Sequence, residues 1–89
     1  MTLQNFQVYF NGKPTAQHYR DLASHKQARM IWSVANTKRV FAEPLCVRAL
    51  GCKPDELNRQ AASAFIDALN RLEPIAAGTF WQQWEAINS

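Results

Sequence analysis

The chain has 89 residues, of which 47% are hydrophobic and 19% are charged, and its formal net charge at pH 7 is +3. This length fits one domain over residues 1–89 with a modest core, and the composition excludes a disordered chain. No apolar run approaches the roughly 18 residues that a membrane span needs, and residues 1–6 lack the basic region of a signal peptide. We therefore expect a cytoplasmic protein in which Cys46 and Cys52 are reduced thiols.

The first predicted element is a strand, because residues 3–10 alternate between apolar and polar side chains. Asn11-Gly12 follows, and this dipeptide is typical of tight hairpins because both residues tolerate positive φ. On the returning strand, Tyr19 would share the face of the apolar residues. These residues are Phe6, Val8 and Phe10. The pattern therefore predicts a β-hairpin over residues 3–19.

Pro14 leaves an alternative open for the second half of this hairpin. Proline has no N–H to donate to a ladder, so the returning strand would have to lie at an edge. The other interpretation is a helix that begins at Pro14 and runs through Tyr19 and Leu22. The sequence favours the hairpin over this helix.

The next segment carries a clear helix start, because Ser24-His25-Lys26-Gln27 has the Ser-x-x-Gln form of a capping box. The helix is expected to run to about Asn36, with Met30 pointing sideways and extending an apolar patch. The side chains expected to face inward are Ala28, Ile31, Trp32 and Ala35. Residues 37–42 follow as a basic loop or a brief strand.

Two more helices are predicted around Gly51. Pro44 suits the first position of a helix over residues 44–50, which Gly51 ends as its C-cap. The inward side chains expected here are Leu45, Cys46, Ala49 and Leu50. The main helix covers residues 53–73, where apolar side chains recur at steps of three and four. Pro54 occupies its first position, and Pro74 marks its end.

The last predicted helix covers residues 80–87 after a turn and is capped by Thr79 or Gly78. Its apolar face, formed by Phe80, Trp84 and Ile87, is expected to dock on the main helix. Trp81 lies about 100° from Phe80 and stays partly exposed, as a side chain for binding or for homodimerisation. The predicted fold is α+β, a small N-terminal β-hairpin packed against three to four α-helices, with an all-α fold as the alternative.

The side chains that could carry chemistry form no known constellation. His18, His25, Cys46 and Cys52 have spacings of seven and six residues, whereas zinc signatures pair ligands two to four apart. No nucleophile elbow, phosphate-binding glycine loop or His-Glu-x-x-His helix occurs. We therefore expect neither an enzyme nor a metal or cofactor site.

Charge is unevenly distributed along the chain. Residues 1–53 hold eight basic and two acidic side chains, whereas residues 54–89 hold two basic and five acidic ones. Such polarity can orient a protein toward a nucleic acid or an acidic protein surface. The basic residues predicted to form a macromolecular interface, together with Trp81, are Arg20, Lys26, Arg29, Lys38 and Arg39.

Residues 47–57 contain the pattern Ala-Leu-Gly-x-x-x-Asp-Glu-Leu. This stretch resembles part of phage-repressor-type helix-turn-helix domains and covers eleven of the 89 residues. In that family the stretch lies after the recognition helix, which implies a packing role. The upstream residues of a helix-turn-helix are not recognisable, so no DNA-contacting residue is transferred to this chain.

From these observations we expect a non-enzymatic protein that docks on another macromolecule, foremost a protein, as an accessory factor or inhibitor. Small proteins of phages and mobile elements, such as inhibitors of CRISPR effectors, have this profile. The alternative is a DNA- or RNA-binding transcriptional regulator that uses the basic cluster of residues 20–39. A homodimer formed through the aromatic C-terminal helix is compatible with both, and no membrane partner is expected.

Overall fold

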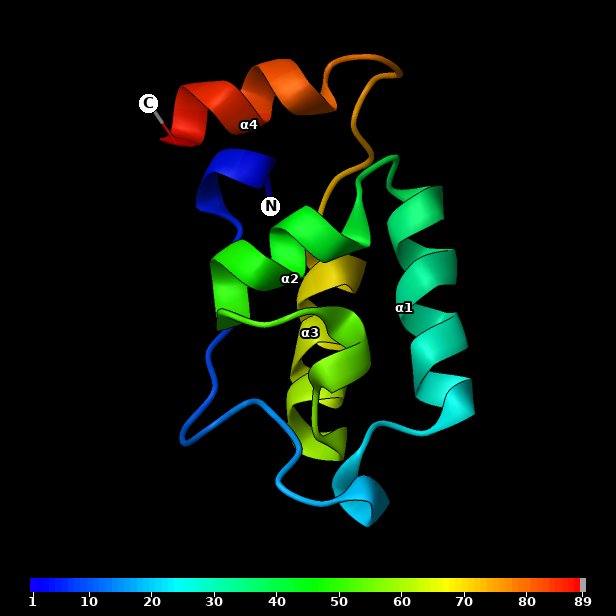
Figure 1. Ribbon diagram of the computed structural model, residues 1–89. Coiled ribbons are helices and arrows are strands. Elements are labelled where there is room, and N and C mark those ends of the chain that lie inside the picture. The colour runs from blue at the N-terminus through cyan, green and yellow to red at the C-terminus, as the bar shows by residue number, and fades with distance from the viewer. Residues whose placement is uncertain (89) are drawn as a thin grey trace.

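The computed structural model describes residues 1–88, and every regular element in that range is helical (Figure 1). The α-helices are α1 (His25–Thr37), α2 (Ala42–Leu50), α3 (Arg59–Arg71) and α4 (Phe80–Asn88). The short 3-10 turns are η1 (Leu3–Asn5), η2 (Tyr19–Asp21) and η3 (Pro54–Glu56). The predicted α+β fold is therefore wrong, and the all-α alternative fits the structure. None of the helices in residues 1–88 has the length and apolar character to cross a membrane.

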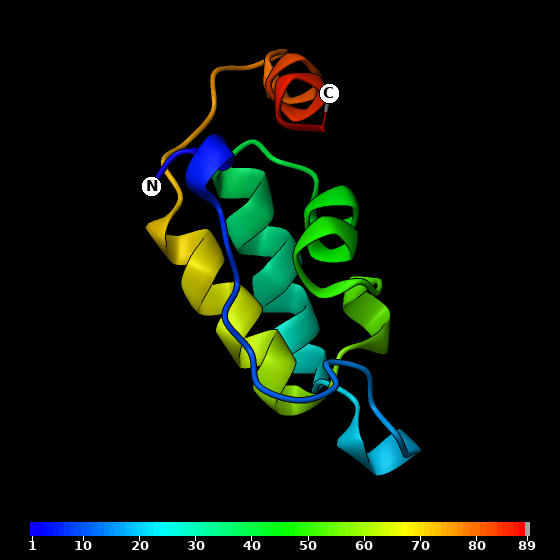
Figure 2. The ribbon, with the colours of Figure 1, turned by 90° about the vertical axis from the view of Figure 1, so that its left-hand side faces the viewer.

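α1 and α3 form the centre of the molecule and run side by side in the same direction (Figures 1 and 2). Their first turns are joined by Gln27, whose side-chain amide donates to the carbonyl of Arg59 at 3.0 Å. At the other end, the N–H of Ile75 donates to the carbonyl of Lys38 at 2.9 Å. The predicted capping box of Ser24 is confirmed, with the N–H of Gln27 donating to the Ser24 hydroxyl at 3.1 Å.

The predicted hairpin is wrong, although the predicted alternation of buried and exposed side chains in its first strand is correct. Phe6 and Val8 are buried while Gln7 and Tyr9 are exposed. The Phe6 ring meets Phe65 of α3 edge to face, with ring centroids 6.1 Å apart. Residues 6–10 thus cover the helices as an extended segment (Figure 2), because apolar side chains that alternate can pack on helices as well as on a sheet.

The segment expected to return along this strand pairs elsewhere. Isolated antiparallel bridges join Thr15 to Leu57 and Leu22 to Asn58. The N–H of Asn58 donates to the carbonyl of Pro14 at 2.8 Å. Proline can accept this hydrogen bond because it lacks only the N–H and keeps its carbonyl. Tyr19 is 90% exposed and shares no face with the buried residues of the first segment. Neither a return strand nor a helix from Pro14 to Leu22 is present.

The main helix begins six residues later than predicted. Residues 54–56 form η3, and α3 starts at Arg59 after Asn58, whose side-chain oxygen accepts from the N–H of Ala61 at 2.8 Å. Leu57 and Asn58 stay extended because their backbone groups bond to the segment around Pro14 and Ala23. A long-range pairing therefore divides the predicted helix.

The flanks of α2 also differ from expectation. The helix begins at Ala42 with Phe41 as its N-cap residue, so no brief strand forms there. Gly51 is confirmed as the C-cap, with φ of 79°. α4 does not dock on α3: it lies over η1, with Phe80 against Phe41 at a centroid distance of 5.1 Å (Figure 1).

Candidate functional site

α1, α2 and α4 enclose an apolar hollow of about 430 Å³ that we call the aromatic groove. Its lining residues are Trp32 of α1, Phe41, Glu43, Pro44 and Val47 at α2, and Trp81 and Trp84 of α4. Three elements that are far apart in the sequence thus contribute to one surface. Two of its lining residues belong to α4, which lies at the opposite end of the molecule from η2 (Figures 1 and 2).

Ring packing holds the groove in shape. Phe80 is 3% exposed and anchors α4 in the core. The rings of Phe80 and Trp84 stack with centroids 5.9 Å apart and an interplanar angle of 18°. The rings of Phe41 and Trp81 stack at 5.3 Å and 24°. The Phe80–Trp84 pair lies within α4, whereas the Phe41–Trp81 pair joins the start of α2 to α4. Because these stacked rings hold one another in place, the groove is preformed and its exposed side chains have little freedom to lose on binding.

Exposed apolar side chains gather at this groove. In residues 1–88, seven large hydrophobic side chains are exposed, and four of them line it. These four are Trp32 (52%), Phe41 (52%), Val47 (45%) and Trp81 (50%). Single exposed apolar residues are ordinary on a protein surface, whereas a contiguous group marks a binding site.

Trp32 corrects one prediction and adds a residue to the site. It was expected to face inward with Ile31 and Ala35, which are buried as predicted. Trp32 projects about 100° further round α1 than Ile31, toward the groove and not toward α3. Met30, expected to point sideways, is 43% exposed.

Arg39 stands at the rim of the groove in an unusual backbone conformation. Its φ is 61°, and it is the non-glycine residue with positive φ in residues 1–88. The N–H of Arg39 donates to the carbonyl of Asn36, and the N–H of Val40 donates to that of Ala35. These two bonds form a Schellman motif, in which glycine is the usual residue at the position of Arg39. A second hollow, which shares Phe41 and Trp81 with the groove, is lined in part by Arg39.

Two further arginines stand beside the groove. The guanidinium of Arg48 lies 5.7 Å from the ring centroid of Trp84, a cation–π distance. Arg29 precedes Trp32 by one turn on α1, and residues three apart are neighbours on a helix surface. Within residues 1–88, no carboxylate forms an ion pair with Arg29, Arg39 or Arg48.

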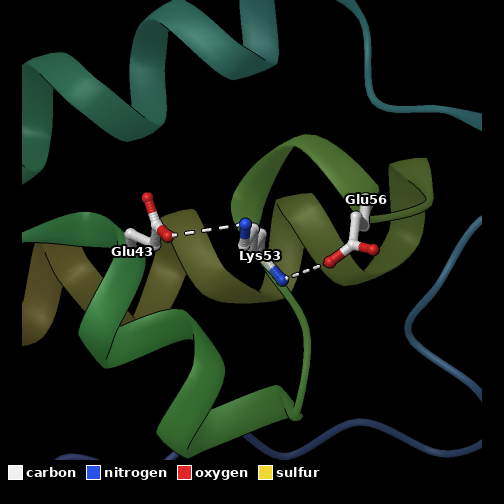
Figure 3. Close-up of polar contacts among 3 residues, drawn as sticks. All are labelled: Glu43, Lys53 and Glu56. Carbon is white, nitrogen blue, oxygen red and sulfur yellow. Dashed lines mark hydrogen bonds and ion pairs between the residues drawn. The ribbon is translucent and has the colours of Figure 1, made fainter.

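The carboxylate that lines the groove is compensated. Glu43 Oε1 lies 3.9 Å from Nζ of Lys53, whose backbone N–H donates to Glu56 Oε1 at 2.9 Å (Figure 3). Both side chains of the ion pair are more than half exposed, so its contribution to stability is small. Its effect on the groove is to leave the arginines as the dominant charge.

The structure separates the predicted basic cluster into two groups. Arg20 lies in η2 and lines a polar hollow of about 550 Å³ at the opposite end from α4, together with Lys13 and Arg59. Lys26 is in the first turn of α1, whereas Lys38 follows its end. Twelve residues of helix place these two lysines about 18 Å apart. Of the predicted basic residues, Arg39 lines a hollow together with Trp81, and Arg29 lies one turn before the groove residue Trp32 on α1.

The two cysteines are buried free thiols whose side chains are hydrogen-bonded to each other. Burial, and then the neighbouring Cys52, raises the pKa of Cys46 to about 12. Burial, and then Glu56 and Asp55, raises the pKa of Cys52. Such thiols are poor nucleophiles at neutral pH. His18 and His25 are exposed, and no group of three potential metal ligands occurs in the part of the chain that the structure describes.

Comparisons with protein-family models, with curated proteins and with solved structures found no match for this chain. The resemblance of residues 47–57 to helix-turn-helix domains therefore stays a prediction. In the structure these residues end α2, pass Gly51 and form η3. Sequence reasoning missed Phe41 and Val47 as groove residues. The signal that could have found them is that both are large apolar side chains at positions where the inward face of α2 does not need them.

Proposed function

We propose that this protein is a non-catalytic binding protein that docks on a partner protein through the aromatic groove, as an accessory factor or inhibitor. The observation that supports this proposal most directly is the gathering of Trp32, Phe41, Val47 and Trp81 on one surface, each about half exposed. Burying half-exposed aromatic side chains in an interface provides a large gain per residue, and tryptophan is enriched among binding hot spots. We also propose that it acts in the cytoplasm, where Cys46 and Cys52 remain free thiols.

Affinity capture from a cell lysate with matched variants tests this proposal. The test variant is Trp81→Ala, which removes a half-exposed groove side chain. The control is Tyr19→Ala, which removes an aromatic side chain that is 90% exposed in η2, at the other end of the molecule (Figure 1). We expect a protein that is retained by the parent chain and by Tyr19→Ala but lost with Trp81→Ala. Equal capture by all three chains would refute a role for the groove.

A second candidate, a nucleic-acid-binding regulator, has one observation in its favour. Lys13, Arg20 and Arg59 surround a hollow of about 550 Å³ in which Asp21 is the opposing charge. Basic side chains around a hollow can neutralise phosphates. This site lies far from the aromatic groove, so the two candidates predict different sensitive residues: Arg20→Glu would weaken nucleic-acid binding, whereas Trp81→Ala would not.

A further inference from the structure

We infer that the occupant of the aromatic groove is an acidic, amphipathic segment of a partner protein, and this inference rests on the proposed function. The groove supplies apolar contact, and its rim supplies positive charge that no carboxylate of residues 1–88 pairs. A complementary ligand therefore carries apolar side chains at its centre and carboxylates at its edge.

The positions of the rim cations define where the carboxylates of the ligand would lie. Arg39 borders the hollow next to Phe41 and Trp81. Arg48 covers the ring of Trp84, and Arg29 lies one turn before Trp32. The cations thus come from α1, from the residue pair after its end and from α2, and the Arg48 guanidinium reaches the ring of Trp84 on α4. Of the carboxylates nearby, Glu43 is paired with Lys53, which leaves Glu85 on α4 as the opposing charge.

The backbone of Arg39 is a second, independent argument for a role in recognition. A left-handed conformation is unfavourable for a residue with a side chain, and glycine would relieve it. Residues kept in such conformations cluster at binding sites. Arg39 is exposed, and glycine would suit the backbone better at its position. A guanidinium that binds a carboxylate of the partner gives a reason for an arginine there.

A protein segment suits this groove better than a nucleic acid does. Bases bind by stacking on free aromatic faces, but Phe41 and Trp81 already stack on each other, and Trp84 already stacks on Phe80 and contacts the guanidinium of Arg48. The aliphatic walls of Pro44 and Val47 favour side chains such as leucine.

Selection of displayed peptides tests the inference with a defined probe. A library of random peptides of about 16 residues, roughly four helical turns, is selected on the parent chain. Clones that also bind the Trp81→Ala variant are discarded, so that the remaining clones require the groove. We expect these groove-specific peptides to be net acidic, with apolar residues three or four apart. Groove-specific peptides that are neutral or basic would overturn the inference and leave the proposed function standing. A complete absence of groove-specific peptides would overturn both.

Charge reversal then tests the rim with one selected acidic peptide. Arg39→Glu combined with Arg48→Glu is expected to weaken its binding at least about tenfold, as measured by fluorescence anisotropy. The matched control is Arg71→Glu combined with Lys13→Glu, which changes the net charge by the same amount at residues that line other hollows and not the groove. Equal losses from the rim pair and from the control pair would show that only net charge matters, and would refute the assignment of the rim.

Two parallel measurements test whether the aromatic groove binds something other than an acidic segment. If sedimentation velocity finds a dimer that Trp81→Ala dissociates, the groove holds a second copy of the chain, and the acidic partner is refuted. If a single-stranded oligonucleotide binds and Trp81→Ala abolishes that binding, the groove holds a nucleic acid, with the same consequence.

Discussion

Arg39 has a backbone conformation that is unfavourable for a residue with a side chain. The Schellman motif that ends α1 requires a left-handed conformation at this position, and Arg39 adopts it with φ of 61°. The left-handed region costs a residue with a Cβ atom roughly 1–2 kcal/mol. The hydrogen bonds of the motif use backbone atoms alone, so the side chain of Arg39 is not required for them. Stability and recognition can therefore be separated at this residue.

We predict that Arg39→Gly raises the free energy of unfolding by about 0.5–1 kcal/mol. Relief of the left-handed conformation exceeds the extra entropy that glycine gains in the unfolded chain. Urea denaturation at neutral pH measures the change. Arg39→Ala is the control, because it removes the guanidinium but keeps the Cβ atom, and its stability should stay near that of the parent. If the glycine variant were less stable than the alanine variant, the backbone argument would be incorrect.

Cys46 provides a prediction about pH at the same scale. Its pKa is about 12 in the folded chain, against 9.0 for an unperturbed thiol, because burial disfavours the thiolate. Below about pH 8 both states keep the proton, so this group causes no change in stability with pH. As the pH rises through 9 the unfolded chain loses the proton while the folded chain keeps it, so the free energy of unfolding falls.

The expected loss from Cys46 is about 2 kcal/mol between roughly pH 8 and pH 10.5. Denaturation curves under reducing conditions, recorded for the parent and for Cys46→Ala, isolate it. The variant should start less stable, because a buried side chain is shortened, but its stability should fall less steeply with pH. Parallel pH dependences for the two chains would mean that Cys46 ionises equally in both states.

At the scale of one element, α3 depends on Asn58 as the residue that both starts the helix and fastens the N-terminal segment. Its side-chain oxygen accepts from the N–H of Ala61, and its side-chain amide donates to the carbonyl of Lys13 at 2.9 Å. Asn58→Ala removes both bonds and should lower the free energy of unfolding by about 1–2 kcal/mol. Asn58→Asp keeps the acceptor and should lose less than half of that. Chemical denaturation measures both, and equal losses would assign the effect to the Lys13 contact.

α4 tests whether the aromatic groove can be altered without unfolding the protein. Phe80 is nearly fully buried, whereas Trp81, the next residue, is half exposed. Phe80→Ala should cost about 3–5 kcal/mol because it leaves a cavity under the helix. Trp81→Ala should cost about 1 kcal/mol, the value of its stacking on Phe41. Thermal unfolding followed by circular dichroism compares the two. A Trp81→Ala loss as large as that of Phe80→Ala would make Trp81 a core residue.

The elements that sequence reasoning predicted correctly are those specified by local chemistry. The capping box of Ser24 and the C-cap of Gly51 depend on residues within one turn, so they were readable. The hairpin was wrong because a two-residue period predicts an extended backbone but does not identify its partner. Residues 6–10 pack their side chains on the helices, and the segment expected to return pairs instead with residues 56–58, more than 30 residues away in the sequence. The same pairing shortened the predicted main helix.

For the candidate site, the sequence could predict whether some single side chains are exposed, but not which of them come together in space. Trp81 was assigned to the exposed side of its helix, and it is half exposed. The prediction that Trp32 faces inward was wrong, because helical periodicity gives the angle between two side chains but not how far round the helix the neighbouring elements cover it. The basic residues were grouped by proximity in the sequence, whereas the length of α1 separates them in space. The groove exists only once α4 lies beside α2.

At the scale of the whole molecule, the distribution of charge favours a protein partner over a nucleic acid. Lys13, Arg20 and Arg59 line the hollow near η2, whereas Arg39 and Arg48 lie near Trp81 and Trp84 of α4. The net charge is only +3. Non-specific binding to DNA requires several cations that contact phosphates at once, and its affinity falls steeply with salt as the counterions exchange. Two separated groups with few cations each should therefore give weak binding.

We predict no saturable binding of labelled random-sequence duplex DNA or single-stranded RNA at about 200 mM salt, and at most weak binding at about 50 mM. Fluorescence anisotropy measures both. Arg20→Glu and Trp81→Ala are compared with the parent, because the first alters the polar hollow near η2 and the second alters the aromatic groove. Tight binding at low salt that collapses at high salt and is lost with Arg20→Glu would make the protein a nucleic-acid-binding regulator, because the cations at the η2 end would then suffice to hold the phosphate backbone.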